Sequence, residues 1–165
     1  MFPSDLMALA STLVADFNAQ GLKLATAESC TGGLIAGLLT EVPGSSAVVD
    51  RGFVTYSNEA KAQMLGIDPL LIKQHGAVSE AVARAMAVGA LGHALVDVTV
   101  AVTGVAGPGG GSAEKPVGLV HFATATRDGR LIHREMRFGD IGRTKVRLAT
   151  IREALALLRG VGIAG

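Results

Sequence analysis

The spacing of apolar residues along the chain alternates between the period of a helix and that of a strand. Between Ser4, a good N-cap, and Gly21, a good stop, apolar side chains recur at helical spacing, which predicts a helix. The same pattern predicts further helices over residues 31–40, 58–65, 80–92 and 141–159, with Ser57-Asn58 and Ser79 as the caps of the second and third of these. Continuous or alternating apolar runs predict strands over residues 22–28, 47–56, 97–104, 118–126 and 131–138.

The order of these elements indicates the fold class. Asp128-Gly129 joins the last two strands and is a strong hairpin signal. Strands that alternate with helices before such a hairpin are typical of an α/β fold, here a three-layer α/β/α sandwich with a mixed, partly antiparallel sheet. The strand over residues 47–56 is expected to break near Arg51 and Gly52. Because the 165 residues show no repeat or linker, a single domain over residues 1–165 is expected.

Composition and charge narrow the classes of partner. Hydrophobic residues make up 49% of the chain but aromatic residues only 4%, so the core must be aliphatic. The mean hydropathy of +0.44 is high and favours apolar surface buried between subunits, so a homo-oligomer is expected, with a dimer as the first choice. A formal net charge of +1 argues against a nucleic-acid-binding surface.

The cysteine count and the N-terminal segment bear on the compartment. Cys30 is the single cysteine, so an internal disulfide and a cysteine-rich metal site are excluded, and a reducing, cytoplasmic setting is expected. The first basic residue is Lys23, so the N-terminal segment lacks the basic start of a signal peptide. No apolar run reaches the ~18 residues that a membrane span needs. We therefore expect no membrane attachment.

The segment TAESCTGG, residues 26–33, contains the first candidate for chemistry. Ser29 lies where a strand is expected to end and a helix to begin, so free backbone N–H groups would point towards it. Such groups can stabilise the oxyanion that forms when a hydroxyl attacks a carbonyl carbon. The alternative is that Ser29 or Thr31 only caps the helix.

A serine nucleophile needs a base, and the sequence offers histidines and lysines. The four histidines have no acid partner at useful spacing and the motif G-x-S-x-G is absent, so a Ser-His-Asp triad is weakly supported. Lys61 lies in the first turns of a short helix, where the helix dipole disfavours its ammonium form, although an ordinary exposed lysine is the alternative. Lys115 forms an S-x-x-K match with Ser112, but three glycines before it and Pro116 after it argue against the required helix.

Cys30 is the rival nucleophile. A cysteine at a helix N-terminus would have a lowered pKa and would react as the thiolate. However, its side chain would tend to point away from the direction that Ser29 takes. The alternative is a small buried thiol without chemistry.

A glycine-rich loop and two arginines suggest an anion site. The loop GVAGPGGGS, residues 104–112, lets backbone amides approach a phosphate, although it is neither a Walker loop nor a clean G-x-G-x-x-G motif. Arg143 and Arg147 lie four residues apart near the start of the last helix, where cations are unfavourable unless an anion is present. A flexible connection and a solvated helix face are the alternatives.

Four segments taken together resemble the C-terminal domain of the CinA proteins. They are TAESCTGG, GSSAVVDRGFVTYSNEAKAQMLG, QHGAVSE and VTGVAGPGGGSAEKPVGLVHFA. The resemblance covers residues 5–158, and its motifs are long and occur in order. It implies hydrolysis of the carboxamide of nicotinamide mononucleotide (NMN) to nicotinate mononucleotide and ammonia, in salvage of pyridine nucleotides. It also implies a mechanism without a metal or another cofactor.

The resemblance further implies roles for individual residues. Ser29 would be the nucleophile and Lys61 the base, with Tyr56 assisting or orienting that pair. The positions that would bind the oxyanion or the substrate are Cys30, Thr31, Gly32, Thr103 and Gly104. The positions that would bind the phosphate are Arg143, Gly109 and Gly110.

Two other functions stay open. One is a catalytically silent nucleotide-binding or interaction module with the same fold, and the other is an amidase for a different amide. The joint presence of Ser29, Tyr56, Lys61 and Thr103 favours the enzyme.

Overall fold

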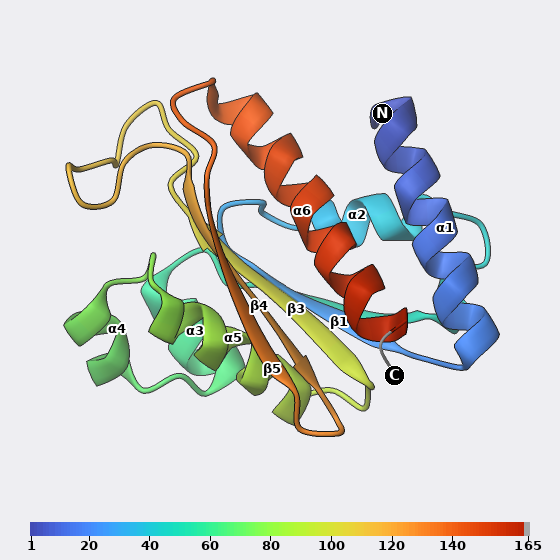
Figure 1. Ribbon diagram of the computed structural model, residues 1–165. Helices are drawn as coiled ribbons and strands as arrows, with labels where there is room; N and C mark the ends of the chain where they lie inside the picture. The colour runs from blue at the N-terminus through green and yellow to red at the C-terminus, as the bar shows by residue number, and fades with distance from the viewer. Residues whose placement is uncertain (164–165) are drawn as a thin grey trace.

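The computed structural model describes residues 1–163 and contains one five-stranded sheet between two layers of helices (Figure 1). The sheet has the strand order β2-β1-β3-β4-β5. Its strands are β1 (Leu24–Glu28), β2 (Val49–Val54), β3 (Val98–Gly104), β4 (Leu119–Thr126) and β5 (Leu131–Arg137). The first three are parallel, whereas β4 and β5 add antiparallel pairs. The mixed three-layer α/β fold expected from the sequence is confirmed.

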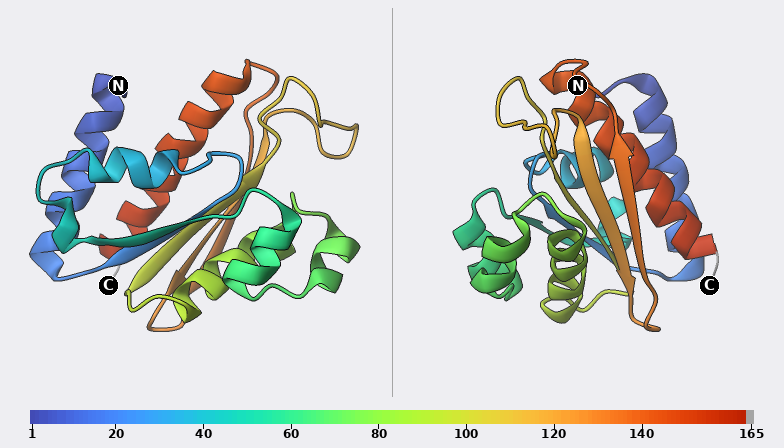
Figure 2. Two further views of the ribbon diagram at one scale, coloured as in Figure 1. Left: turned by 180° about the vertical axis from the view of Figure 1, so that it is seen from behind. Right: turned by 60° about the vertical axis from the view of Figure 1, so that its left-hand side comes forward.

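The helices fall into one layer on each face of the sheet (Figure 2). One layer contains α1 (Ser4–Gln20), α2 (Leu34–Thr40) and α6 (Arg143–Ile163). The other contains α3 (Asn58–Leu65), α4 (Pro69–His75) and α5 (Glu80–Gly92). The terminal helices α1 and α6 lie side by side, so the two ends of the chain share one layer (Figure 1).

The two faces of the sheet carry side chains of different size because residues alternate between faces along a strand. In β3, Val100 and Val102 belong to the core beneath α1, α2 and α6. Ala101, on the opposite face, packs in a separate core with the alanine-rich side of α5. Small side chains on both partners let α5 approach the sheet closely, and Thr99 Oγ1 donates a hydrogen bond to Ala87 O at 2.7 Å.

Gly89 sets the distance between α3 and α5. A Cβ atom at position 89 would lie 2.2 Å from the backbone oxygen of Leu65, which is closer than real Cβ atoms come. Leu65 is the last residue of α3, and the same helix carries Lys61. Only glycine at position 89 therefore allows α3 to pack at this distance.

Several helix boundaries differ from the expected ones. Ser57 and Ser79 cap α3 and α5 with their side chains, as expected. The expected cap at Ser4 is wrong, because α1 begins at Ser4 itself, behind Pro3 and without a side-chain cap. The helix expected over residues 31–40 begins only at Leu34, and the one expected over residues 141–159 spans Arg143–Ile163.

Two features around β2 and α4 differ as well. β2 is one continuous strand through Arg51 and Gly52, but its pairing with β1 is irregular directly before Arg51, because Leu24 pairs with Val49 and Ala25 with Arg51. The pattern of apolar residues does not predict α4, although Asp68 followed by Pro69 is a helix-start signal. Asp68 accepts the backbone N–H of Leu70, and Pro69 takes the first helical turn.

The parallel strands bring three chain segments together. β1, β2 and β3 end at Glu28, Val54 and Gly104, and because they run in the same direction their carboxyl ends meet at one edge of the sheet. The long loop between β3 and β4 projects from the same end (Figure 1). In open α/β sheets this edge is where ligands bind.

Candidate active site

Ser29 begins a tight turn between β1 and α2. Its backbone N–H still donates to Val102 O at 3.1 Å, as if β1 continued, and its side chain is nearly buried, with 9% exposed. The N–H of Gly32 then donates to Ser29 O at 3.0 Å and closes the turn. Gly32 and Gly33 adopt positive φ values of 59° and 98°, which other residues rarely adopt. The two glycines of TAESCTGG therefore shape the turn that leads into α2, and Gly33 is the residue directly before that helix.

Glu28 anchors this turn from inside the protein. Its carboxylate is fully buried and accepts hydrogen bonds from Thr31 Oγ1 at 2.6 Å and Thr26 Oγ1 at 3.2 Å. It also accepts the backbone N–H groups of Ile35 at 2.9 Å and Ala36 at 3.0 Å in the first turn of α2. The helix cap is therefore Glu28, and the alternative of a cap at Ser29 or Thr31 is wrong. The acid ahead of the glycine pair is the signal that could have indicated this.

Lys61 reaches the nucleophile candidate from the other layer. Its side chain is 1% exposed, and its Nζ donates to Thr55 O at 2.9 Å and to Ser29 Oγ at 3.0 Å. Burial lowers the pKa of this amine below its usual value of 10.5, because an ammonium ion loses hydration there. The alternative of an exposed lysine is thus wrong. A lysine whose pKa is lowered and whose amine contacts a hydroxyl has the arrangement of a general base once it loses its proton.

Cys30 does not have the properties of a nucleophile. Its side chain is 7% exposed, and burial raises the pKa of its thiol to about 12. The lowered pKa that the rival hypothesis requires is contradicted, because loss of hydration outweighs the favourable charges of Arg147 and Lys61. At neutral pH the thiol stays protonated, which leaves Ser29 as the better nucleophile.

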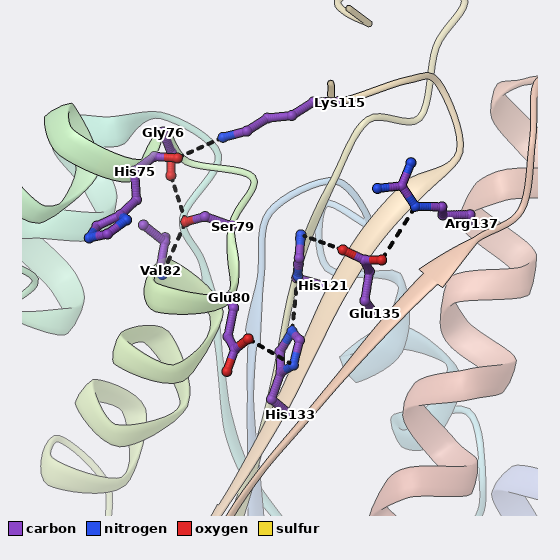
Figure 3. A network of polar contacts seen from close by, with 10 residues as sticks. All are labelled: His75, Gly76, Ser79, Glu80, Val82, Lys115, His121, His133, Glu135 and Arg137. Atoms are coloured by element: carbon purple, nitrogen blue, oxygen red, sulfur yellow. Dashed lines mark hydrogen bonds and ion pairs between the residues drawn. The ribbon is translucent and has the colours of Figure 1, made fainter. Parts of the chain in front are cut away.

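Two histidines form a polar network between α5, β4 and β5 (Figure 3). His121 Nδ1 lies 2.9 Å from His133 Nε2, and the two rings stack. Contrary to the expectation from spacing, both have acid neighbours, with Glu135 3.7 Å from His121 and Glu80 3.6 Å from His133. Within residues 1–163, neither imidazole has a hydrogen bond to Ser29, so the network does not complete a triad.

A pocket of about 280 Å³ opens beside Ser29 and Lys61. Its lining comes from the turn after β1, the start of α3, the segment before α5 and the glycine-rich loop. Nine of the site residues predicted from the sequence line this pocket: Ser29, Cys30, Tyr56, Lys61, Thr103, Gly104, Gly109, Gly110 and Arg143. Thr31 and Gly32 are not among the lining residues, because Thr31 is fully buried on Glu28 and Gly32 faces Arg147.

Tyr56 and Arg143 form the outer rim of this pocket. The Tyr56 side chain is 61% exposed, and its hydroxyl accepts a hydrogen bond from Arg143 Nη2 at 3.0 Å. Arg143 Nη1 donates to Gly107 O at 2.8 Å, which ties the glycine-rich loop to the start of α6. In the described residues the Tyr56 hydroxyl meets Arg143, and it has no hydrogen bond to Ser29 or Lys61.

Thr103 and Gly104 shape the floor of the pocket at the end of β3. Thr103 is 1% exposed, and its Oγ1 donates to Ala77 O at 2.8 Å, which fixes the segment before α5. At Gly104 a Cβ atom would lie 2.7 Å from a Val120 methyl and 2.8 Å from Leu119 O. Gly104 therefore permits close packing of β3 against β4, besides lining the pocket.

The sequence pattern misses two contributors to the site, Glu28 and Asn58, and assigns a different role to Arg147. Glu28 and Arg147 hold the nucleophile turn, and Arg147 donates to Cys30 O and Thr31 O where an anion contact was the hypothesis. Asn58, at the start of α3, also lines the pocket. Lys115 lies away from Ser29: its Nζ donates to His75 O, and the residues around it form no helix.

The structure also bears on metal binding and on membrane-spanning helices. Across residues 1–163, no group of three or more histidine, cysteine, aspartate or glutamate side chains is placed to hold a metal ion. None of the helices in that range is long and apolar enough to cross a membrane.

Comparisons with known proteins find relatives over most of the chain. The chain is 52% identical over 141 residues to nicotinamide-nucleotide amidohydrolase PncC of Escherichia coli, covering 85% of this chain and 86% of that protein. It is 54% identical over 139 residues to a putative competence-damage inducible protein of Caldicellulosiruptor bescii, covering 84% of this chain. The chain spans about a third of the length of the latter relative.

A solved structure and a family model each match nearly the whole chain. The crystal structure of competence/damage inducible protein CihA from Agrobacterium tumefaciens superposes with a TM-score of 0.94 and 61% identity, covering 96% of each chain. The model of the CinA C-terminal domain matches residues 6–161. The protein therefore belongs to the CinA C-terminal domain family.

Proposed function

We propose that the protein hydrolyses the carboxamide of NMN to nicotinate mononucleotide and ammonia, as an enzyme of pyridine-nucleotide salvage. The observation that carries the proposal is the contact of the buried Lys61 Nζ with Ser29 Oγ at 3.0 Å beside an open pocket. The 52% identity to a relative named nicotinamide-nucleotide amidohydrolase, over most of both chains, supports the choice of substrate.

The first half of the reaction forms an acyl-enzyme. Neutral Lys61 removes the hydroxyl proton of Ser29 while Ser29 Oγ forms a bond to the carboxamide carbon. The carbonyl oxygen becomes an oxyanion. The resulting Lys61 ammonium then donates its proton to the amide nitrogen, the C–N bond breaks, and ammonia leaves.

Water completes the reaction. Neutral Lys61 removes a proton from a water molecule, which attacks the acyl carbon and forms a second tetrahedral intermediate. When that intermediate collapses, the bond to Ser29 Oγ breaks and Lys61 returns the proton to the serine. The products are nicotinate mononucleotide and the original enzyme, and neither a metal nor a cofactor takes part in this scheme.

The oxyanion requires donors in the turn after β1. The amides of Cys30, Thr31 and Gly32 are the group expected from the sequence. The Gly32 N–H is already used, because it donates to Ser29 O at 3.0 Å. Thr31 is fully buried and does not line the pocket, so we propose that the backbone N–H of Cys30, which does line it, contacts the oxyanion.

The charges at the pocket suit a nucleotide with an amide at one end and a phosphate at the other. Lys61 lies at the inner end and Arg143 at the rim, and no carboxylate is among the lining residues that the structure describes. We propose that Arg143 and the amides of Gly109 and Gly110 bind the phosphate. Tyr56 positions Arg143 through its hydroxyl, and the pyridinium ring near Lys61 helps to keep that amine neutral.

Ammonia release tests the proposal directly. The purified protein is incubated with NMN and with a panel of other amides, and ammonia is measured, with Ser29→Ala as the blank. NMN turnover that is lost in the blank supports the proposal. Turnover of another amide alone would assign a different substrate, and NMN binding without ammonia would indicate a silent binding module. Light scattering of the same sample tests the expected dimer.

A further inference from the structure

Arg147 contacts the nucleophile turn from α6. It lies one helical turn after Arg143, and its half-buried side chain crosses to the end of β1. Its Nε donates to Cys30 O at 3.1 Å, and its Nη2 donates to Thr31 O at 3.0 Å. The guanidinium thus binds two consecutive carbonyl groups with two different nitrogens, which fixes the orientation of both peptide units.

The orientation of these peptide units decides where their N–H groups point. A trans peptide is planar, so its N–H points away from the side on which its carbonyl is held. The carbonyl of Thr31 shares its plane with the N–H of Gly32, and that N–H donates to Ser29 O. The carbonyl of Cys30 shares its plane with the N–H of Thr31, so the bond from Arg147 to that carbonyl fixes this peptide unit as well. Arg147 therefore fixes the peptide units on both sides of Thr31.

The space around the guanidinium also fits this contact. A Cβ atom at position 32 would lie 3.3 Å from Arg147 Nη2, and Gly32 has a φ of 59°. Glycine at this position leaves room for the arginine and permits the backbone conformation at the same time. On the inner side, Glu28 holds the Thr31 hydroxyl at 2.6 Å. The turn is thus held from two sides by opposite charges.

We infer that Arg147 is a positioning residue for the reaction proposed above. It holds the peptide units of residues 30–32 so that Ser29 Oγ stays at Lys61. Its positive charge beside the turn also favours the oxyanion. The inference rests on the proposed function, and it assigns Arg147 to the nucleophile turn and Arg143 to the substrate.

Steady-state kinetics of Arg147→Lys and Arg147→Gln test this role. Lysine keeps the charge but cannot bind two carbonyl groups in a fixed geometry. Both variants should lose about 100-fold in kcat, as for a reacting group displaced by about 1 Å, with KM changed less than about 3-fold. Arg159→Gln, on the same helix and bonded to Asp16, is the matched control and should keep full activity. An unchanged kcat, or a loss confined to KM, would overturn the inference.

Hydrogen exchange separates this inference from the proposed function. Amides of residues 29–36 should exchange faster in Arg147→Gln than in the parent protein and in Arg159→Gln, while β3 and α5 keep the parent rates. Faster exchange throughout the chain, or unchanged exchange in the turn, would show that Arg147 does not hold this segment and would overturn the inference. If the parent protein releases no ammonia from NMN, the proposed function fails, and the exchange data alone decide whether Arg147 holds the turn.

Discussion

Lys61 Nζ and Ser29 Oγ lie 3.0 Å apart although 32 residues separate them in the sequence. Their meeting follows from the sheet, because β1 and β2 are parallel neighbours and Glu28 pairs with Val54 at their ends. Ser29 follows the first strand directly, and Lys61 follows the second after one cap and one helical turn. The parallel pairing of β1 and β2 thus brings the proposed base and the proposed nucleophile into contact from two distant segments.

Single substitutions should show whether Ser29 or Cys30 is the nucleophile. Ser29→Ala should abolish ammonia release from NMN and leave the fold intact, because a methyl group cannot attack a carbonyl. Cys30→Ala should keep most activity, since the thiol is buried and protonated. Ammonia assays with circular dichroism of both variants check this. An inactive cysteine variant beside an active serine variant would reverse the assignment.

The rate should depend on the protonation of Lys61. Burial lowers its pKa below 10.5, so the rate should rise with pH as the amine loses its proton. Lys61→Arg should be nearly inactive at every pH, because arginine keeps its charge. A pH–rate profile of the parent and the variant checks both statements. Chelators should have no effect, and a loss in EDTA that zinc restores would contradict the proposed chemistry.

The buried amine should also affect stability in a pH-dependent way. Because the folded state has the lower pKa at Lys61, the unfolded chain binds more protons from that pKa up to about 10.5. The free energy of unfolding contributed by Lys61 therefore increases with pH across this window. Urea titrations of the parent and Lys61→Met should show the difference shifting in favour of the parent as pH rises. A shift in the opposite direction would mean that the folded state favours the ammonium form.

Arg143 should act through the phosphate of the substrate. Arg143→Ala should reduce kcat/KM for NMN by roughly 10–100-fold, as expected for one lost charge-assisted hydrogen bond. Nicotinamide riboside lacks the phosphate, so its slow turnover should hardly change. Tyr56→Phe removes the hydrogen bond to Arg143 and should cause a smaller loss with the same dependence on the phosphate. Equal losses on both substrates would instead make Arg143 structural.

The sequence predicts the layers of the fold well because each element has a strong local signal. The caps at Ser57 and Ser79 and the hairpin at Asp128-Gly129 depend on neighbouring residues, and all three are present. The turn after β1 is less predictable. Its two glycines resemble the start of a helix, whereas the true cap is the carboxylate of Glu28, which reaches forward to Ala36.

Side-chain partners across the fold are harder to predict than elements. The helix dipole argument predicts an anion beside Arg143 and Arg147, yet both guanidinium groups bind backbone oxygens from other segments. The packing of the turn after β1 against α6 decides which carbonyl groups contact that helix. The spacing of residues in the sequence does not predict this packing. The burial of Lys61 is similar, because it results from the packing of α3 against the sheet and α5.

The close contact of Gly89 with the backbone of Leu65 has a consequence for reading mutational scans. Any side chain at position 89 must move the end of α3, and with it the amine that Lys61 presents to Ser29. Gly89 lines no part of the pocket beside that pair, so it would score as essential in an activity screen while touching neither substrate nor base. Positions that are sensitive to substitution in this protein therefore include residues that only position the reacting groups, as well as residues that carry those groups.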